Sequence, residues 1–389
     1  MRIAIVSDAA YPFTKGGAEK RYHGLALQLA AWGHQVDWYT MRYWVGERLL
    51  LTDGIRYVGV CRPLPFYSGS RRSIREAVIF GLACLRLLGR AERYDVVDCS
   101  QHPFFSVPVM GLVAKRWRAA LVVSWYETWG AHWLEYLGWR GIVGRWVERW
   151  CARVPQCLIV VSEQALARLR SEGMRPKRAV HVPLGIELDR IQRTPAAAEP
   201  VDVIYFGRLK SHKNVDVLLR ALILVAAARP SLRALIVGDG PEADTLRNLA
   251  RELLLDHAVR FRGVVDSYDE LMGMVKAARL FILPSTKEGG GSIVTLEANA
   301  CGTPVIAVDH PLGIDKGLIQ EGVNGFWVSP PLTSERLAER IIQVLRDPRI
   351  DNEWRHRSLE RSRAYDLPAM ARRIEMVYSQ VAKEALPAG

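Results

Sequence analysis

Short apolar runs, each the length of one strand and followed by a helix-length segment, recur through the first half of this 389-residue chain. Such runs are typical of parallel strands, because the helices that join these strands cover both faces of the sheet. The pattern therefore predicts an α/β fold with a doubly wound sheet. We expect its strands at Ile3–Val6, Val36–Tyr39, Val96–Val97, Leu121–Ser124 and Leu158–Val161.

The same alternation begins again after a stretch rich in proline and alanine, Ile191 to Pro200. A chain of this length exceeds one ordinary core. We therefore expect two Rossmann-like domains, residues 1–190 and 201–367, which face a cleft at the carboxyl ends of their strands. Residues 368–389 are expected to form a final amphipathic helix. The second set of strands is expected at Val203–Phe206, Ala234–Val237, Val259–Phe261, Leu280–Leu283 and Val305–Ala307.

The most informative motif runs from Lys287 to Ile306, where a glycine loop joins a predicted strand to a predicted helix. Backbone N–H groups and the positive end of the helix dipole favour an anion at such a loop. Glu288 precedes the loop and Glu297 follows it. Carboxylates bind phosphates poorly, but they accept hydrogen bonds from sugar hydroxyls. The motif thus indicates a ligand with both phosphates and hydroxyls, such as a nucleotide sugar.

Two further loops follow predicted strands. Gly16 and Gly17 stand before a helix that is expected to reach Trp32, and a glycine pair lets the backbone approach a phosphate. An ordinary strand-to-helix turn explains this pair equally well. Arg208 and Lys213 follow the first strand of the second domain, where both can converge on a diphosphate. Two loop cations can also be solvated surface residues.

The strand ending at Ser124 is followed by Tyr126 and Glu127, and His102 follows the neighbouring predicted strand. These side chains are candidates for orienting a sugar or an acceptor hydroxyl, although a lone histidine is more often structural. The turn Val237 to Glu242 is assigned to structure. No Asp-x-Asp or His-x-x-x-His pattern occurs, so we expect neither a metal nor a cofactor.

The net charge of +12 is unevenly distributed. Residues 1–190 contain 27 Lys and Arg against 16 Asp and Glu, whereas residues 191–389 contain 26 against 25. This asymmetry favours an anionic partner for the first half. Nucleic acid is not expected, because no helix-turn-helix, zinc or RNA-binding signature occurs. The segment His132 to Arg153 mixes tryptophans with arginines, which suits a helix on an anionic membrane; a core helix with a solvated arginine face is an equal alternative.

The remaining composition indicates a cytoplasmic protein, and the charge distribution adds the expectation of peripheral attachment to the cytoplasmic face of the membrane. The N-terminus reads as a buried strand and lacks the features of a signal peptide. No apolar run approaches the roughly 18 residues that span a bilayer. Six cysteines show no metal-ligand spacing and suggest reduced core residues: Cys61, Cys84, Cys99, Cys151, Cys157 and Cys301.

Taken in order, these motifs resemble those of the family 4 glycosyltransferases, which have the GT-B fold and retain anomeric configuration. The resemblance covers nearly the whole chain. It is carried by Gly16-Gly17-Ala18-Glu19, Gly33-His34-Gln35-Val36, Val182-Pro183-Leu184-Gly185-Ile186-Glu187, Gly207-Arg208-Leu209 with Lys213, Gly238-Asp239-Gly240-Pro241, and Glu288 with Glu297-Ala298 and Cys301-Gly302-Thr303-Pro304-Val305.

The resemblance implies a role for each matching position. Gly16 and Gly17 would donate backbone amides to the donor diphosphate, and Arg208 and Lys213 would neutralise its charge. Glu288 would hold hydroxyls of the donor sugar. The remaining donor-binding positions would be Gly289, Gly290, Gly291, Ser292 and Ile293 for the backbone cradle and Glu297 for the ribose hydroxyls. The final helix would cross back to pack on the first domain, and no metal would be needed.

The chain departs from the family pattern in two places. Eight residues, rather than seven, separate Glu288 from Glu297, which is expected to widen the glycine loop. Tyr126 stands where the family often has a histidine, and a tyrosine is a poor base near neutral pH.

The sequence therefore predicts a hexosyltransferase that moves a hexose from a UDP-, GDP- or ADP-linked sugar to a lipid-linked or saccharide acceptor. A nucleotide-sugar epimerase on the same fold is one alternative. A non-catalytic nucleotide-sugar-binding subunit is the other.

Overall fold

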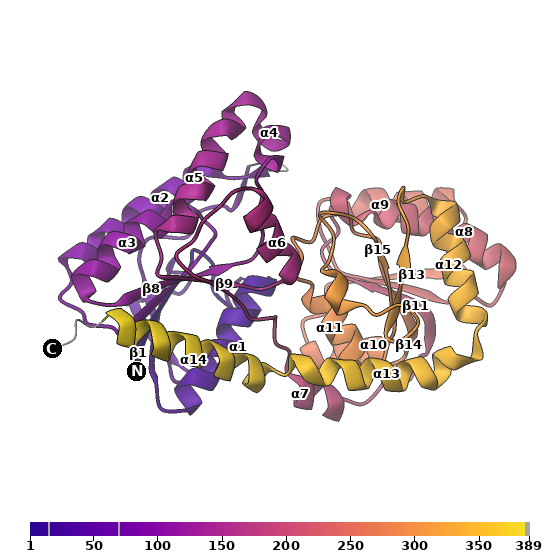
Figure 1. Ribbon diagram of the computed structural model, residues 1–389. Coiled ribbons are helices and arrows are strands. Elements are labelled where there is room, and N and C mark those ends of the chain that lie inside the picture. The colour runs from indigo at the N-terminus through magenta and orange to yellow at the C-terminus, as the bar shows by residue number, and fades with distance from the viewer. Residues whose placement is uncertain (15, 69–70, 386–389) are drawn as a thin grey trace. The chain divides into compact units, whose positions relative to one another are not determined.

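The computed structural model describes residues 1–14, 16–68 and 71–385 and divides the chain into two compact units. Unit 1 contains residues 1–185 together with the C-terminal segment from Leu367, and unit 2 contains residues 186–366. Each unit is built on its own sheet (Figure 1). The predicted α/β class with two mainly parallel sheets is confirmed.

Unit 1 has an eight-stranded sheet of order β10-β9-β8-β7-β1-β2-β4-β3, in which only the β3–β4 pairing is antiparallel among the described strands. The five predicted strands all form, and the short strands β3, β4 and β10 join them. The sheet strands are β1 (Arg2–Val6), β2 (Gln35–Thr40), β3 (Leu49–Thr52), β4 (Ile55–Gly59), β7 (Val96–Ser100), β8 (Ala120–Trp125), β9 (Cys157–Val160) and β10 (Ala179–His181). A separate small hairpin consists of β5 (Tyr67–Ser68) and β6 (Arg71–Arg72).

Alternate side chains of these strands enter two separate cores, as the twofold period of a strand requires. Ile3 and Ile5 face the core that contains α1 and α14, whereas Ala4 and Val6 face the core on the other side. The helices of this unit are α1 (Gly17–Ala31), α2 (Ile74–Cys84), η1 (Leu85–Gly89), α3 (Ser106–Trp117), α4 (His132–Leu137), η2 (Gly138–Arg140), α5 (Gly141–Arg153), α6 (Glu163–Ser171) and α14 (Leu367–Ala385).

The final helix packs on unit 1, as the family resemblance implies. Leu367, Ile374 and Tyr378 of α14 are buried in the same core as Leu25 of α1. Figure 1 shows α14 beside α1, although the two helices are more than 300 residues apart in the chain. The helix was expected over residues 368–389, and its last described residue is Ala385.

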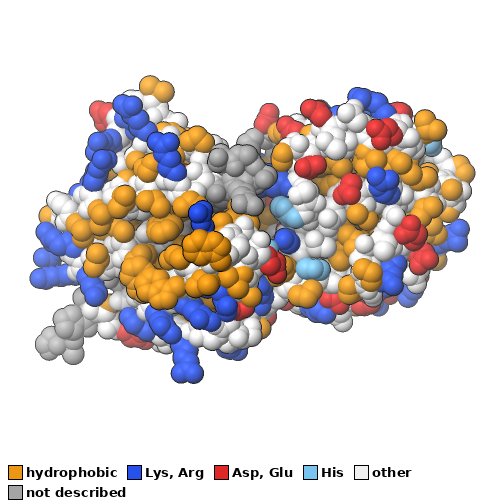
Figure 2. Space-filling model, turned by 90° about the horizontal axis from the view of Figure 1, so that it is seen from above, with side chains coloured by type: hydrophobic (Ala, Val, Ile, Leu, Met, Phe, Trp, Pro, Cys, Tyr) orange, Lys and Arg blue, Asp and Glu red, His pale blue; other side chains and the backbone are white. Residues whose placement is uncertain are grey.

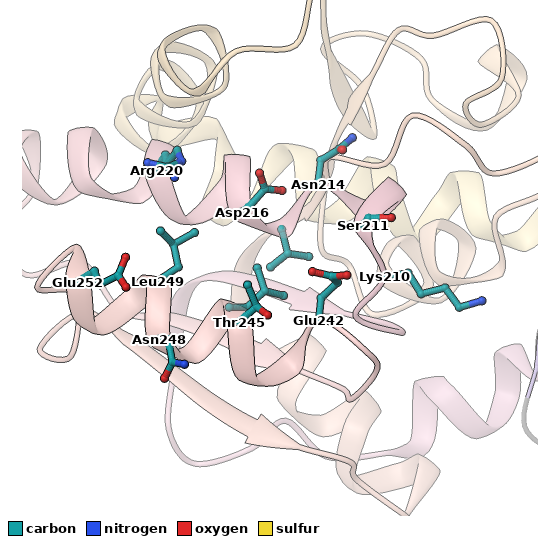
Figure 3. A pocket seen from close by; sticks show the side chains of 12 residues that line it. Lys210, Ser211, Asn214, Asp216, Arg220, Glu242, Thr245, Asn248, Leu249 and Glu252 are labelled. Atoms are coloured by element: carbon teal, nitrogen blue, oxygen red, sulfur yellow. The ribbon is translucent and has the colours of Figure 1, made fainter. Parts of the chain in front are cut away.

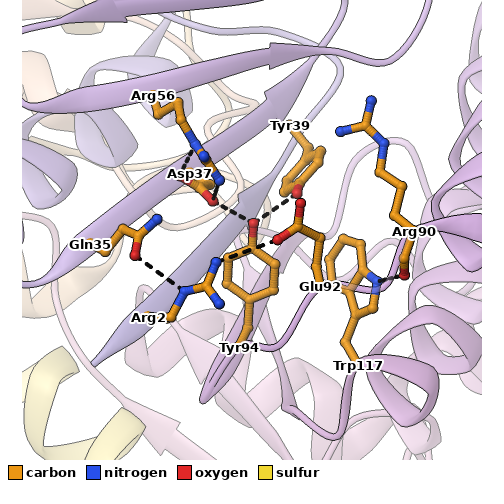
Figure 4. Close-up of polar contacts among 9 residues, drawn as sticks. All are labelled: Arg2, Gln35, Asp37, Tyr39, Arg56, Arg90, Glu92, Tyr94 and Trp117. Carbon is orange, nitrogen blue, oxygen red and sulfur yellow. Dashed lines mark hydrogen bonds and ion pairs between the residues drawn. The ribbon is translucent and has the colours of Figure 1, made fainter.

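A buried carboxylate lies among arginine and tyrosine side chains at the amino-terminal side of this sheet (Figure 4). Asp37 of β2 is fully buried. Its carboxylate accepts hydrogen bonds from Nε and Nη2 of Arg56 and from the hydroxyl of Tyr94. The Tyr94 hydroxyl also pairs with that of Tyr39 at 2.7 Å. These contacts tie β2 to β4 and to the start of β7, so we assign the cluster to structure.

Unit 2 has a six-stranded, fully parallel sheet of order β13-β12-β11-β14-β15-β16. Its strands are β11 (Val201–Phe206), β12 (Ala234–Val237), β13 (Val259–Gly263), β14 (Ala278–Leu283), β15 (Val305–Val308) and β16 (Gly325–Val328). The first five were predicted, and β16 was not. Its helices are α7 (Leu188–Arg193), η3 (Ser211–Lys213), α8 (Val215–Ala228), α9 (Ala243–Glu252), α10 (Tyr268–Lys276), α11 (Ile293–Ala300), η4 (Lys316–Leu318), α12 (Ser334–Arg346), η5 (Pro348–Asp351), α13 (Glu353–Ser362) and η6 (Arg363–Tyr365).

The division between the units falls at Gly185 and Ile186, earlier than the expected Pro/Ala linker. The reason is that the stretch predicted as a linker is bound to α10. The Ala197 N–H donates to the Gly273 carbonyl at 2.9 Å, and Lys276 Nζ donates to the Thr194 carbonyl at 2.6 Å. Residues 191–200 are therefore an integral part of unit 2.

Candidate active site

The predicted donor-binding residues of unit 2 lie at the carboxyl edge of its sheet. Arg208 follows β11, Glu288 follows β14, and these two strands are neighbours. Parallel strands bring the loops after their carboxyl ends together, which is why ligands bind there in open α/β sheets.

Lys213 and Glu288 meet directly. Lys213 Nζ lies 2.5 Å from Glu288 Oε1, and the two side chains are only 17% and 10% exposed. A charge pair this poorly solvated persists only when each partner compensates the other. The structure thus brings together two residues that are 75 positions apart in the chain and that the sequence predicted for one site.

A set of hydrogen bonds holds the Lys213 segment against the chain after β14. Asn214 has a left-handed backbone (φ 50°), and its side-chain Nδ2 donates to the Pro284 carbonyl at 3.0 Å. The His212 carbonyl accepts from the Ser285 hydroxyl and from the Thr286 N–H, both at 3.3 Å. The Lys213–Glu288 contact is therefore positioned by backbone interactions on both sides.

The imidazole of His212 is affected by this environment. Burial, together with the neighbouring Lys213 ammonium, lowers the pKa of His212 from 6.5 to about 4. A proton on this ring would add a third cation beside Lys210 and Lys213. His212 is therefore neutral at physiological pH.

The glycine loop differs from the expected cradle in one respect. The N–H groups of Glu288 and Gly289 donate to the Leu312 carbonyl at 2.8 and 3.3 Å, and the Gly290 N–H donates to Gly313 at 3.0 Å. These three amides are thus engaged with the segment after β15. Gly289 and Gly290 both have positive φ, 65° and 95°, which only glycine adopts readily. Two successive left-handed residues accommodate the longer loop between the two glutamates.

The N-terminus of α11 follows directly after Gly291 and Ser292. The Ser292 hydroxyl pairs with the Thr295 hydroxyl at 2.9 Å rather than with a backbone N–H of the helix. Ile293 is the first residue of α11. The first-turn N–H groups of α11 are therefore the part of this loop that suits a phosphate.

Glu297 is buried within α11 and has a partner that the sequence analysis did not identify. Its Oε1 accepts the hydroxyl of Tyr268 at 3.0 Å. Burial and the nearby Glu297 carboxylate raise the pKa of Tyr268, so this hydroxyl stays a donor. Arg190 stacks over the Tyr268 ring at 5.0 Å. The Ser267-x-x-Glu270 capping pattern, which starts α10 at Tyr268, was the available signal.

Arg208 is exposed on the loop after β11, and its carbonyl accepts the Tyr205 hydroxyl at 3.3 Å. The turn Gly238 to Gly240, assigned above to structure, supports this loop. A Cβ at Gly238 would stand 2.0 Å from the Gly207 carbonyl oxygen, and the Leu209 N–H donates to Asp239 at 2.9 Å. The role of Arg208 toward a diphosphate stays a prediction.

In unit 1, Gly16 and Gly17 stand where α1 begins, after the carboxyl end of β1. A Cβ at Gly16 would stand 2.2 Å from the Glu19 carboxylate, so a larger residue there requires the flexible end of the Glu19 side chain to move. Lys15 lies outside the described residues. The predicted contact of the two glycines with a diphosphate remains untested.

His102 and Glu127 are brought together at the ends of β7 and β8. His102 Nε2 lies 3.2 Å from Glu127 Oε1. Burial opposes ionisation of Glu127, but the hydrogen bond and charge of His102 outweigh it and lower the pKa of this carboxyl. Gln101, which the sequence analysis missed, accepts from the N–H groups of Tyr126 and Glu127 and so holds this corner.

Tyr126 lies differently from the expectation. Its hydroxyl faces α1 and accepts from Arg21 Nη1 at 3.4 Å. Arg21 also donates to the Ser124 hydroxyl, which in turn donates to the buried Asp98. Tyr126 therefore belongs to a buried network, which explains how a tyrosine is accommodated at a position where the family often has histidine. Its predicted role in orienting a substrate has no further support.

Unit 2 also contains a pocket of about 580 Å³, beside the segment that carries Lys213 (Figure 3). It is lined by α8, α9 and the loop before them, including Lys210, Asn214 and Glu242. The predicted site residues are not among its lining residues. The described residues also contain no group of three or more His, Cys, Asp or Glu side chains that can hold a metal ion.

Known protein families match both structural units of the chain. Residues 16–185 match the family "Glycosyl transferase 4-like domain", and residues 189–361 match "Glycosyl transferases group 1". The two matched ranges follow the two structural units. The fold and these matches define a glycosyltransferase with the GT-B fold. The chain belongs to the family 4 glycosyltransferases, as its motifs predicted.

Relatives cover different shares of the chain. A GDP-mannose-dependent monoacylated alpha-(1-6)-phosphatidylinositol monomannoside mannosyltransferase of Corynebacterium glutamicum is 32% identical over 49% of this chain and 53% of its own length. A phosphatidyl-myo-inositol mannosyltransferase of Mycobacterium leprae is 27% identical over 98% of this chain and 97% of its own. Sucrose-phosphate synthase from Thermosynechococcus elongatus has the same fold, with a TM-score of 0.77, 23% identity and 98% coverage of both chains.

Proposed function

We propose that this glycosyltransferase moves a hexose from a nucleoside diphosphate sugar to an acceptor hydroxyl, with retention of anomeric configuration and without a metal ion. The observation that carries the proposal is the contact of Lys213 with Glu288 at the carboxyl edge of unit 2. It pairs a cation suited to a diphosphate with a carboxylate suited to sugar hydroxyls. The buried Glu297 lies on the helix that follows the same loop.

In the proposed reaction, the main contribution of the protein is to stabilise the charge that develops on the departing diphosphate. The bond between the anomeric carbon and the diphosphate oxygen breaks, and its electron pair goes to that oxygen. The acceptor oxygen forms the new bond on the face from which the diphosphate leaves, and its proton passes to the departing phosphate oxygen. Lys213 and Arg208 stabilise the growing negative charge, which is the largest catalytic contribution in such a step.

The pairing of Lys213 is compatible with this role. An ammonium has three donors, and Glu288 uses one of them. The remaining donors are available to phosphate oxygens. Glu288 thereby holds the ammonium in place and retains a second oxygen for a sugar hydroxyl.

The donor and the acceptor are proposed from the relatives. GDP-mannose and a phosphatidylinositol monomannoside are named for the relative from Corynebacterium glutamicum, and phosphatidyl-myo-inositol for that from Mycobacterium leprae; these should be tried first. The excess of positive charge in residues 1–190 supports a lipid-linked, anionic acceptor at the membrane face.

The test begins with donor binding. Thermal unfolding is followed with GDP, UDP, ADP and their sugars in the presence of EDTA. Stabilisation by one nucleotide family is expected, because ligand that binds only the folded state raises its stability by about 2.7 kcal/mol at 100 times Kd. Glu297→Gln should lose that stabilisation, whereas Glu252→Gln, an exposed carboxylate of α9, should keep it.

Transfer is then measured with labelled donor and a lipid acceptor, and the anomeric linkage of the product is determined. Lys213→Ala should abolish transfer while the fold remains intact. Full activity in both Lys213→Ala and Glu297→Gln would refute the assignment of the site. An inverted linkage would refute retention, and loss of activity with EDTA would refute metal independence.

A further inference from the structure

Several large exposed apolar side chains of unit 1 lie together on the segment from α4 to α5. It is formed by Trp139, Ile142, Val143, Trp146 and Trp150, which we call the tryptophan face. Trp139, Ile142 and Trp146 are 76%, 63% and 65% exposed. Positions 142, 146 and 150 repeat every four residues, so they share one side of α5. Large apolar side chains gathered at this exposure mark an interaction surface.

The segment His132 to Arg153, which the sequence indicated as helical, forms a compact helical hairpin of α4, η2 and α5. A Cβ at Gly141 would stand 2.1 Å from the Trp133 carbonyl oxygen, so α4 packs closely on the start of α5. Glu148 is fully buried and accepts the N–H groups of Trp129 and Gly130 at 2.8 Å. The side of α5 that carries Glu148 faces the protein, and the tryptophan face is the opposite side.

Exposed apolar side chains also occur on other helices of unit 1. Ile74 and Leu82 of α2 and Leu112 of α3 are also exposed. These helices adjoin closely, because Gly111 of α3 contacts Val154 at the end of α5. Figure 2 shows hydrophobic side chains gathered with Lys and Arg on this side of unit 1, and Figure 1 shows that α2, α3, α4 and α5 lie together there.

The arginines of α5 divide into two groups. Arg145 donates to the Glu172 carboxylate at 2.9 Å, and Arg149 donates to the Glu172 backbone carbonyl at 3.0 Å. These two bonds hold the hairpin against the chain after α6. Arg140 and Arg153 are exposed at the two ends of the tryptophan face. The Arg140 guanidinium lies 5.6 Å from the Trp139 ring. The surface thus combines apolar side chains with cations at its rim.

These features distinguish between two occupants. A symmetric pair of chains would place the cationic rims of two copies against each other, which opposes association. An anionic lipid surface complements the same rim and accepts tryptophan side chains at the depth of the headgroups. Among the described residues, no helix is long and apolar enough to cross a membrane.

We infer that the tryptophan face docks unit 1 on an anionic bilayer, with Trp139, Trp146 and Trp150 entering the headgroup region and Arg140 and Arg153 contacting lipid phosphates. The inference deepens the proposed lipid acceptor, because it assigns the surface that brings the enzyme to that substrate. Binding to lipid needs neither donor nor acceptor, and it can therefore be tested apart from transfer.

The experiment measures co-sedimentation of the full chain with vesicles of phosphatidylcholine, with and without one third phosphatidylglycerol. The paired change Trp139→Ser and Trp146→Ser should weaken binding about tenfold. The matched control is Met376→Ser, which removes a similarly exposed apolar side chain from α14 and should bind as the parent does. Arg140→Gln with Arg153→Gln should weaken binding only to vesicles that contain phosphatidylglycerol.

The tryptophan fluorescence of the parent should shift to shorter wavelength on binding, and this shift should be lost in the paired variant. Unchanged binding of the paired variant, or equal binding to neutral and anionic vesicles, would overturn the inference. So would a concentration-dependent dimer that the paired variant abolishes. Nucleotide-induced stabilisation of the same proteins verifies that unit 2 is folded and reports the proposed donor site independently.

Discussion

The contact between Lys213 and Glu288 makes a quantitative prediction, because its two charges are close and poorly solvated. At 2.5 Å and an effective dielectric constant of about 20, the gross attraction is roughly 7 kcal/mol, most of which is offset by desolvation. The measurable consequence is a coupling between the two residues. Lys213→Met and Glu288→Gln should each cost about 2 kcal/mol, since each leaves one charge without its partner.

The double variant should cost less than the sum of the single variants by about 1.5–3 kcal/mol. Thermal unfolding of the four proteins provides the test, and a cost of 2 kcal/mol corresponds to about 4–8 °C for a unit of this size. Arg247 and Asp244 form a matched control pair in the same unit, at 2.9 Å but with Arg247 35% and Asp244 94% exposed. Their coupling should be below about 1 kcal/mol.

If the costs of the two site substitutions are additive within about 0.5 kcal/mol, the pair does not form in solution and the reasoning fails. The same proteins should then be tested with the nucleotide that stabilises the parent. Lys213→Met should lose more of that stabilisation than Glu288→Gln, because we propose that the lysine binds the diphosphate and the glutamate binds the sugar. The reverse order would exchange the two assigned roles.

Three further predictions concern unit 2. The pKa of His212 is about 4 in the folded protein and 6.5 ordinarily, so the unfolded chain binds the proton more tightly between these values. The free energy of unfolding should therefore fall by about 1–2 kcal/mol from pH 7 to pH 5. In urea unfolding, His212→Gln should lack this part of the pH-dependent loss of stability. Tyr268→Phe removes the hydroxyl that donates to Glu297, so the KM for the donor should rise about three- to tenfold with little change in kcat; an unchanged KM would contradict a role at the ribose. Gly238→Ala should destabilise by about 2–4 kcal/mol in thermal unfolding, because its φ is +133° and its Cβ would meet the Gly207 carbonyl; Gly263→Ala, with φ +75° and open space around the Cβ, should cost about 1 kcal/mol.

Much of the fold was predictable because parallel strands are buried on both faces and stand out as apolar runs. β11 and β14 were found in this way. The edge strand β3 was missed, since its residues alternate between half-buried and exposed and its antiparallel pairing needs no crossover helix. The boundary at Gly185 was missed for a different reason. A proline- and alanine-rich stretch has the composition of a linker, and only tertiary contacts with α10 reveal that residues 191–200 belong to unit 2.

The residues of the candidate site were predictable from the sequence, but their contacts with one another were not. Strand ends placed Lys213 and Glu288 at one edge, yet no spacing rule could pair side chains 75 residues apart. The glycine loop illustrates the limit more sharply, because a glycine run does not tell whether its amides are free. Here Gly289 and Gly290 donate to the chain after β15, so their contribution is to turn the backbone rather than to bind an anion. In unit 2 we therefore expect a diphosphate to bind at the first turn of α11 and at the two cations Arg208 and Lys213. It follows that substitutions in the glycine run should disturb the position of Glu288 before they affect the binding of phosphate.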